Sequence, residues 1–212
     1  HFFVCASTDA ETAVVVASAG NDAGFAVDTP ANCPGVIGVA GLRNVGTKVG
    51  FSSLGPEVDI SAPGGNCVNL SGACLYPIVT TTNSGSTTPV ANSAAYTDSY
   101  DASLGTSFSA PMVAGTAALM LSARPSLSPA DIRSLMMSTS RPFPTTGGTP
   151  GTQTCVAPSS TEQLECYCTT QTCGAGMLDA GAAVAAAAPV DRPVASLAMT
   201  PAQARPGLPV TF

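Results

Sequence analysis

The chain has 212 residues, of which 9% are charged and 45% hydrophobic, and it contains 21 Gly and 18 Pro. This composition is typical of a compact, loop-rich globular protein and excludes an intrinsically disordered chain. A net charge of −6 with a single lysine leaves no basic surface to neutralise phosphates, so we expect no nucleic-acid partner. No apolar run reaches the length that crosses a bilayer, which predicts no membrane span. Because the chain begins at His1 without a methionine, we expect processing ahead of it.

The cysteine count predicts an oxidising compartment. Eight cysteines accompany one histidine without any Cys-x-x-Cys pair, which favours disulfides over a zinc site. We therefore expect a protein that is secreted, periplasmic or exposed on the cell surface. Cys67 and Cys74 bracket a short loop and are expected to pair, as are Cys5 and Cys33 across the strand between them. The other four close a loop near the carboxyl end, in a pairing that the sequence leaves open: Cys155, Cys166, Cys168 and Cys173.

The first half of the chain contains short apolar strands separated by turns. Residues 13–18 form an apolar, β-branched run ending at Gly20 and Asn21, the pattern of a buried parallel strand followed by a turn. Open α/β sheets bind ligands at this carboxyl edge. Residues 36–40 form a second short apolar strand. From residue 65 to 103 the sequence predicts a long surface loop with one short strand at 78–82.

The segment from residue 104 to 120 is expected to organise the site. Gly105 allows a tight turn, and the hydroxyl side chains of Thr106, Ser107 and Ser109 are suited to capping a helix start. Pro111 is tolerated only near that start, so the helix should begin close to Ser107. The Ser107 hydroxyl then lies at the positive end of the helix dipole, a setting suited to a developing oxyanion. A plain helix cap is the alternative role for Ser107.

Two further helices and a change of composition complete the chain. Ser128 and Pro129 are a helix cap and a first helical residue, followed by apolar positions at helical spacing. An alanine-rich last helix ends near Ala188. Residues 1–188 are thus expected to belong to one domain. The Pro-rich residues 189–212 are expected to be a linker and the truncated start of a β-sandwich-like module.

Three blocks of the sequence resemble the subtilisin-like serine proteases, and they occur in the order found in that family. They are VVVASAGN at 14–21, FSSLGPEVDISAPG at 51–64 and GTSFSAPMVAG at 105–115. The first is similar to the strand that ends in the family's oxyanion asparagine, and the last to its nucleophile motif. The resemblance covers roughly residues 10–188. It implies an α/β domain of three layers with a mainly parallel sheet, of which this chain is the carboxy-terminal part.

The resemblance implies a secreted serine endopeptidase of bacterial type that needs no cofactor for catalysis. Ser107 would attack the peptide carbonyl, while the Asn21 side chain and the Ser107 N–H would stabilise the oxyanion; for Asn21 alone, a plain turn residue is the alternative. Asp28 falls near the base of the first specificity pocket, where a carboxylate favours Lys or Arg before the scissile bond. A solvated loop aspartate is the alternative for Asp28. Further substrate contacts are implied at Ser18, Ala19, Gly20 and Thr106.

The resemblance also implies a weak structural cation site. Its ligands would be the carbonyls of Ala31, Cys33 and Val36 and the carboxylate of Asp59. Such an all-oxygen set suits calcium or sodium. The ion would be structural, because the reaction implied for Ser107 needs no metal.

The sequence departs from the family in the catalytic triad. The family's order along the chain is Asp, then His, then Ser, yet neither an aspartate block nor a His-Gly-Thr-His-type block precedes Asn21. Without a general base, Ser107 is a weak nucleophile. We therefore expect residues 1–212 alone to be inactive. The expected partners are an amino-terminal part carrying the Asp and His, and a peptide or protein substrate. The rival hypothesis is a catalytically incomplete domain that binds peptides or serves as a surface module.

Overall fold

A computed structural model describes residues 13–65, 77–98 and 104–188. Several predictions fall outside these ranges. They concern the Cys67–Cys74 pair, the partner proposed for Cys33, and the linker and β module at 189–212.

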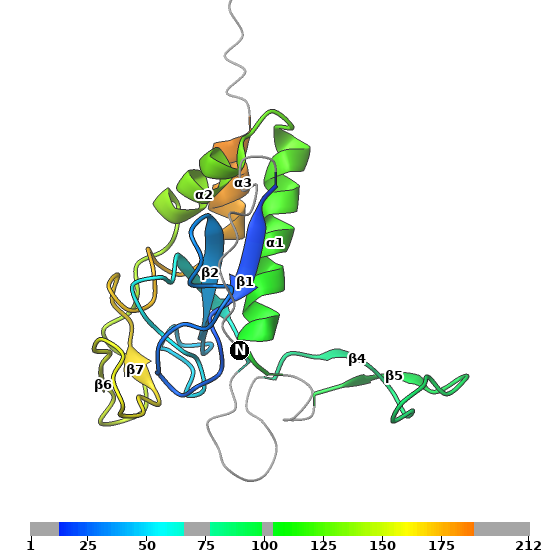
Figure 1. Ribbon diagram of the computed structural model, residues 1–212. Helices are drawn as coiled ribbons and strands as arrows, with labels where there is room; N and C mark the ends of the chain where they lie inside the picture. The colour runs from blue at the N-terminus through cyan, green and yellow to red at the C-terminus, as the bar shows by residue number, and fades with distance from the viewer. Residues whose placement is uncertain (1–12, 66–76, 99–103, 189–212) are drawn as a thin grey trace, which may run out of the picture.

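Three parallel strands form the centre of the domain (Figure 1). Strand β1 (Val15–Ser18) pairs with β2 (Val36–Leu42), and β2 pairs with β3 (Ile60–Pro63). Every residue of β2 is buried, as expected for the middle strand of a parallel sheet. The strands predicted at 13–18 and 36–40 are confirmed, and the block at 51–64 contributes β3.

The helices pack over one face of this sheet. Helix α1 (Thr106–Ala123) contacts all three strands, and α3 (Ala180–Ala187) packs against both α1 and α2 (Pro129–Ser138). Side chains from the helices and that sheet face make up the main core, which includes Ile37, Val39, Ile60, Val113, Met120, Ile132 and Met136. A second cluster, which includes Val27, Ala40 and Val58, packs loop side chains against β2. The parallel sheet with packed helices confirms the predicted α/β class.

Helix α1 is apolar around its whole circumference and has 18 residues, none of them charged. By length and composition it could span a membrane, and it is the one such helix among the described residues. Its face bearing Val113, Ala117 and Met120 is nevertheless buried against the sheet, as in the core helix of a globular protein. The helix begins at Thr106, one residue before the predicted start, and Pro111 is its sixth residue, in the second turn instead of the first.

The start of α1 is capped differently from the prediction. Its N-cap is Gly105, which has no side chain to offer. The hydroxyls of Thr106 and Ser109 donate to oxygens of other segments instead of accepting from helix amides. The predicted side-chain cap from within the helix is therefore wrong.

The other helix starts agree with the sequence. The Ser128 hydroxyl accepts from Asp131 N at 3.1 Å, and the Asp131 carboxylate accepts from Ser128 N at 3.1 Å, which makes a reciprocal capping box before Pro129. Helix α3 is capped by Asp179, whose side chain accepts from Ala182 N at 2.9 Å, and it ends at Ala187.

An antiparallel hairpin stands away from the rest of the domain (Figure 1). Its strands are β4 (Thr80–Asn83) and β5 (Ala94–Thr97). The single strand predicted at 78–82 thus begins two residues later and ends one residue later, and β5 was not predicted. Neither strand shows an apolar alternation that would signal a buried face, and all their residues are exposed or half-buried.

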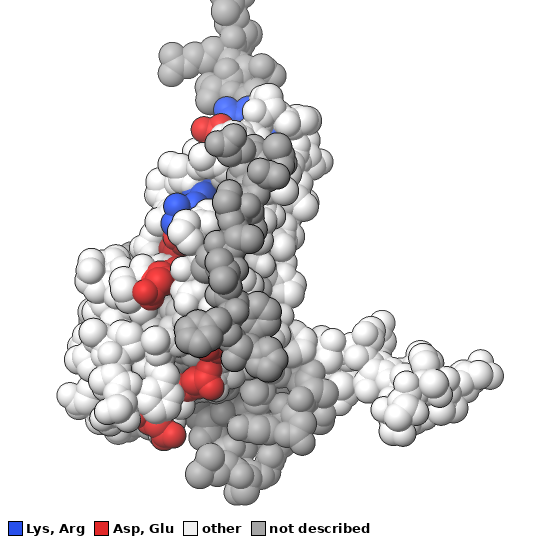
Figure 2. Space-filling view, in the orientation of Figure 1, with Lys and Arg blue, Asp and Glu red and all other residues white. Residues whose placement is uncertain are grey.

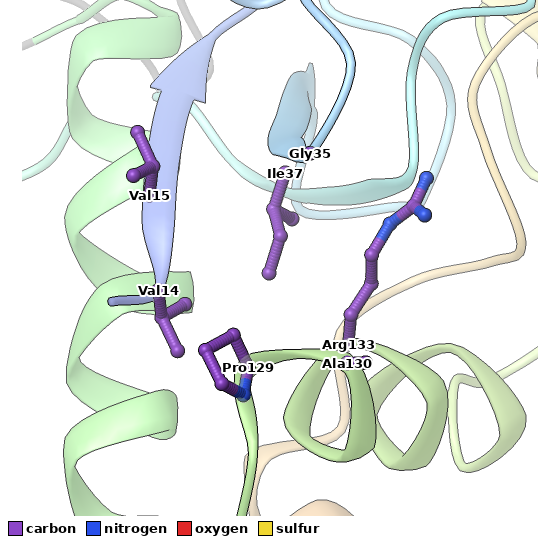
Figure 3. A pocket seen from close by; sticks show the side chains of 7 residues that line it. All are labelled: Val14, Val15, Gly35, Ile37, Pro129, Ala130 and Arg133. Atoms are coloured by element: carbon purple, nitrogen blue, oxygen red, sulfur yellow. The ribbon is translucent and has the colours of Figure 1, made fainter. Parts of the chain in front are cut away.

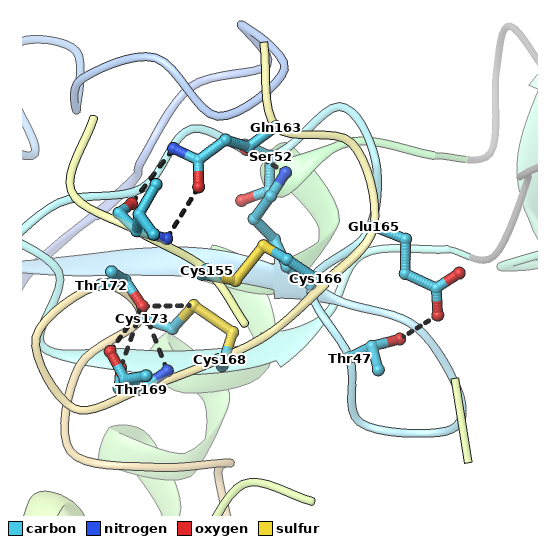
Figure 4. The surroundings of a disulfide bond; sticks show 12 residues. Thr47, Ser52, Cys155, Gln163, Glu165, Cys166, Cys168, Thr169, Thr172 and Cys173 are labelled. Carbon is cyan, nitrogen blue, oxygen red and sulfur yellow. Dashed lines mark hydrogen bonds between the residues drawn. A yellow bond between two sulfur atoms is a disulfide. The ribbon is translucent and has the colours of Figure 1, made fainter. Parts of the chain in front are cut away.

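Two disulfides close the loop between α2 and α3 (Figure 4). Cys155 is bonded to Cys166 and Cys168 to Cys173, which settles the pairing that the sequence left open. These bonds flank the short parallel pair of β6 (Gln153–Thr154) and β7 (Cys166–Tyr167). Cys33 is also disulfide-bonded. No cysteine among the described residues is free.

Candidate active site

The carboxyl end of β1 meets the amino end of α1. The Asn21 Oδ1 atom accepts a hydrogen bond of 3.0 Å from Thr106 N, and it lies 3.0 Å from Thr106 Oγ1. The same hydroxyl lies 3.1 Å from the Gly20 carbonyl oxygen. This contact joins residues 85 positions apart. It brings the two predicted catalytic residues together, because Ser107 follows Thr106 directly.

The end of β3 also holds the start of α1. Gly105 N donates to the Gly64 carbonyl at 2.8 Å, and Ser109 Oγ donates to the Pro63 carbonyl at 3.1 Å. Gly105 has a φ of 136°, a backbone conformation that residues other than glycine rarely adopt. Ser107 is therefore presented, exposed, in a first turn whose position is fixed by two strands.

The contact leaves two N–H donors for a ligand. Asn21 is exposed, and its Nδ2 donates to no acceptor among the described residues, since only Oδ1 is bonded. The backbone N–H of Ser107 lies in the first turn of α1, where amides have no partner within the helix. Such a pair of donors at the positive end of a helix dipole is suited to binding an anionic oxygen.

Asp28 lies directly beneath the end of β1. A methyl group placed on Gly20 would come within 2.4 Å of Asp28 Oδ2, and Asp28 N donates to the Ala19 carbonyl at 2.9 Å. Desolvation raises the pKa of Asp28, and a hydrogen bond and charge repulsion from Asp22 raise that pKa further. Two carboxyl groups thus share this position. Asp28 was predicted from the sequence, and Asp22 was not.

The other predicted substrate contacts differ in their exposure and in how many of their polar groups are already hydrogen-bonded. Ala19 is buried, and both its backbone groups are bonded within the protein, the amide to the Val39 carbonyl. Thr106 is fully buried, and its hydroxyl donates to the Asn21 side chain. Ser18 and Gly20 are half-buried. Of the predicted set, these two and Asp28 are accessible to a ligand.

The four predicted cation ligands line one hollow, and Arg133 lines it too. The Asp59 side chain is buried, and its Oδ2 accepts from Gly38 N at 3.0 Å while its Oδ1 is paired with the Arg133 guanidinium. The Arg133 side chain extends from α2 toward the sheet (Figure 3). The carboxylate therefore already has a cation, and the residues do not fit a metal ion while Arg133 holds this position.

Comparison with known proteins agrees with the geometry. The sequence pattern of the Subtilase family matches residues 4–188. The chain belongs to the subtilase family. It is similar to an extracellular protease of Xanthomonas campestris pv. campestris, with 39% identity over 177 residues that cover 82% of this chain and 23% of that protein. It is also similar to the halolysin-like extracellular serine protease Nep of Natrialba magadii, with 37% identity over 57% of this chain and 18% of that protein.

Solved structures show the same relationship. The proteases from Pseudoalteromonas arctica PAMC 21717 share 38% identity and a TM-score of 0.61 over 82% of this chain and 43% of theirs. The self-cleaved protease domain of PatA matches 82% of this chain and 49% of its own at 23% identity with a TM-score of 0.54, which shows the fold alone. The subtilase chain described here therefore spans less than half the length of these similar proteins.

Reasoning from the sequence missed one residue close to the site of this subtilase chain. Lys48 is fully buried, although lysine is among the residues most often exposed. The available signal was its place between apolar neighbours in the run Val45 to Phe51.

Proposed function

We propose that this chain is the carboxy-terminal part of the catalytic domain of a secreted serine endopeptidase. Ser107 is the nucleophile, and the Asn21 side chain and the Ser107 N–H bind the oxyanion. The observation that carries this proposal is the bond between Asn21 Oδ1 and Thr106 N. It places an amide donor and a helix amino end beside one serine hydroxyl. The names of the similar proteins from Xanthomonas and Natrialba support an extracellular protease activity.

The proposed chemistry assigns each residue of the site one task. The Ser107 hydroxyl oxygen bonds to the peptide carbonyl carbon, and its proton passes to a general base. The carbonyl oxygen becomes negative and accepts hydrogen bonds from Asn21 Nδ2 and Ser107 N. As this intermediate collapses, the base gives the proton to the leaving nitrogen, the amine departs and an acyl group remains on Ser107, which water then removes.

The general base is proposed to come from an amino-terminal part of the same protease. The one histidine of the sequence is His1, so the described residues include none. Helix α1 supports a further covering layer, because its exposed face carries Met112 and Leu119, the latter 58% exposed, and no charge. That part would cover this face and supply the aspartate and histidine of the triad.

The carboxylates beneath β1 support a preference for Lys or Arg before the scissile bond. Desolvation, together with a hydrogen bond and charge repulsion from Asp22, raises the pKa of Asp28 and so disfavours its charged form. A basic substrate side chain would relieve this repulsion through charge-assisted hydrogen bonds. The two disulfides of the 155–173 loop support export to an oxidising compartment.

A fluorophosphonate probe, which reacts with activated serines, tests the proposal. We expect labelling of Ser107 when this chain is produced together with the amino-terminal part, and none when it is produced alone. Ser107→Ala should abolish labelling, while Ser122→Ala, at the exposed far end of the same helix, should retain it. Labelling that survives Ser107→Ala contradicts the assignment of the nucleophile. Peptide binding without turnover in the assembled protein would favour the binding-module hypothesis instead.

A further inference from the structure

Lys48 is the one lysine of the chain, and it is fully buried. Its Nζ donates to three backbone carbonyls: that of Val49 at 3.1 Å, that of Gly50 at 3.1 Å and that of Ser52 at 2.8 Å. These acceptors match the three hydrogens of an ammonium group. None of the ion pairs of the described residues includes Lys48.

Burying such a cation is unfavourable, so its presence calls for a physical reason. A charged group without a carboxylate partner is costly to remove from water. Burial accordingly lowers the pKa of Lys48 to about 7. The buried ammonium orders residues 49–53, because three of the four carbonyls from Val49 to Ser52 accept hydrogen bonds from the same Nζ atom.

Residues 49–53 in turn hold the turn that carries Asn21. Ala23 N donates to the Phe51 carbonyl at 2.8 Å and Gly24 N to the Ser52 carbonyl at 3.0 Å. Ahead of them, Asp22 N donates to Ser53 Oγ at 3.2 Å, and Ser53 N donates to the Gly20 carbonyl at 3.0 Å. Asn21 is thus bracketed on both sides by bonds to the segment that Lys48 organises.

The turn needs this support because part of it is strained. Ala23 has a φ of 46°, in the left-handed region that residues with a Cβ avoid. A second contact holds it from the other side, where Gln163 N donates to the Ala23 carbonyl at 2.7 Å. Gln163 belongs to the loop closed by the Cys155–Cys166 disulfide (Figure 4). A strained turn that is bonded from both sides keeps one conformation, and with it one position of the Asn21 backbone.

We propose that Lys48 is a positioning residue of the oxyanion site, which holds residues 49–53 so that they fix the Asn21 turn and with it the backbone position from which the Asn21 carboxamide extends. This inference rests on the proposed function. It differs from a purely structural role of Lys48, which would affect folding alone.

The test compares Lys48→Met with Ile132→Ala in the full-length protease that contains this sequence. Ile132 is a fully buried residue of α2, and its truncation weakens the core without touching the turn. Turnover of a chromogenic peptide is measured below the melting temperature of both variants. We expect Lys48→Met to lower kcat about tenfold or more with KM within about twofold, while Ile132→Ala lowers the melting temperature and leaves kcat unchanged.

A double-mutant cycle separates positioning from folding. In an Asn21→Ala background, Lys48→Met should lower kcat no further, because the donor that it positions is already gone. An unchanged kcat in Lys48→Met, or the same loss with and without Asn21, overturns the proposal. If Lys48→Met does not fold, Ser53→Ala takes its place in the double-mutant cycle with Asn21→Ala. This variant removes the acceptor of the Asp22 N bond and leaves Lys48 unchanged. Failure of the proposed function is distinct, since it appears as peptidase activity that survives Ser107→Ala in the otherwise unaltered protease.

Discussion

The proposal assigns two tasks to two different atoms of Asn21, and substitutions can separate them. Its Oδ1 accepts from Thr106 N and lies within hydrogen-bond distance of Thr106 Oγ1, each at 3.0 Å, and so caps α1. Its Nδ2 is the proposed oxyanion donor. Asn21→Ala removes both atoms, whereas Asn21→Asp keeps an acceptor oxygen and removes only the donor.

The two variants should therefore have different stabilities. Asn21→Ala leaves the Thr106 amide without its cap, which costs about 1–2 kcal/mol of unfolding free energy. In Asn21→Asp the carboxylate still accepts from that amide and gains from the helix dipole by about 0.3–1 kcal/mol. Repulsion from Asp22 and Asp28 opposes this gain, so we expect its stability to stay within about 1 kcal/mol of the unaltered protein.

Their activities should be lowered alike. Loss of one oxyanion donor lowers kcat by about 10²–10³, a magnitude measured in subtilisin itself and therefore borrowed from this family. The assay pairs kcat and KM on a chromogenic peptide with denaturant unfolding, both on the full-length protease. Asn21→Asp that keeps kcat within threefold of the unaltered enzyme would refute the donor role. Asn21→Ala as stable as Asn21→Asp would refute the capping role.

Three further outcomes are expected. Asp28→Ser should reduce the preference for Arg over Leu before the scissile bond by roughly 10–100-fold, measured with paired peptides, because one charge-assisted bond is lost; an unchanged ratio contradicts the pocket assignment. Arg133→Met should lower the unfolding free energy by about 1–2 kcal/mol, since Asp59 loses its cation but Arg133 is partly exposed. Millimolar calcium should raise the melting temperature of this variant more than that of the unaltered protein, and equal shifts contradict the competition. NMR of ¹³C-labelled lysine should show Lys48 titrating near pH 7. Because this folded pKa lies below the unfolded value, stability relative to Lys48→Met should rise between pH 7 and 10 by up to about 1.4 kcal/mol per unit; a midpoint above pH 9 contradicts it.

Local patterns in the sequence predicted the regular elements well. The strands β1 and β2 are apolar, β-branched runs with turn residues at their ends, and such runs have few alternatives in a parallel sheet. The capping box at Ser128 lies within four residues, so all its bonds could be foreseen from the sequence. The hairpin of β4 and β5 was not predicted, because its Thr-rich and Ala-rich strands have no buried face and so show no alternation of apolar and polar residues.

The residues that sequence reasoning missed act through long-range contacts. Arg133 lies 74 positions from the Asp59 carboxylate that it neutralises, and the pattern of α2 gives no reason to choose it. Lys48 is bridged to a segment far along the chain, where the Cys166 carbonyl accepts from Lys48 N at 2.9 Å. Charge alone would place both residues on the surface, because residue type carries no information about which segments meet.

The wrong prediction at the start of α1 explains how the site acquires its direction. A cap from within the helix would have left the Asn21 carboxamide free to turn. Instead, the carboxamide faces the Thr106 backbone N–H, which can only donate, so it must present its oxygen there. Because the oxygen and the nitrogen of the carboxamide diverge from one carbon, Nδ2 then cannot face the Thr106 amide. The bond that caps the helix is thus also the bond that aims the proposed oxyanion donor, so the site forms only when the end of β1 and the start of α1 have docked.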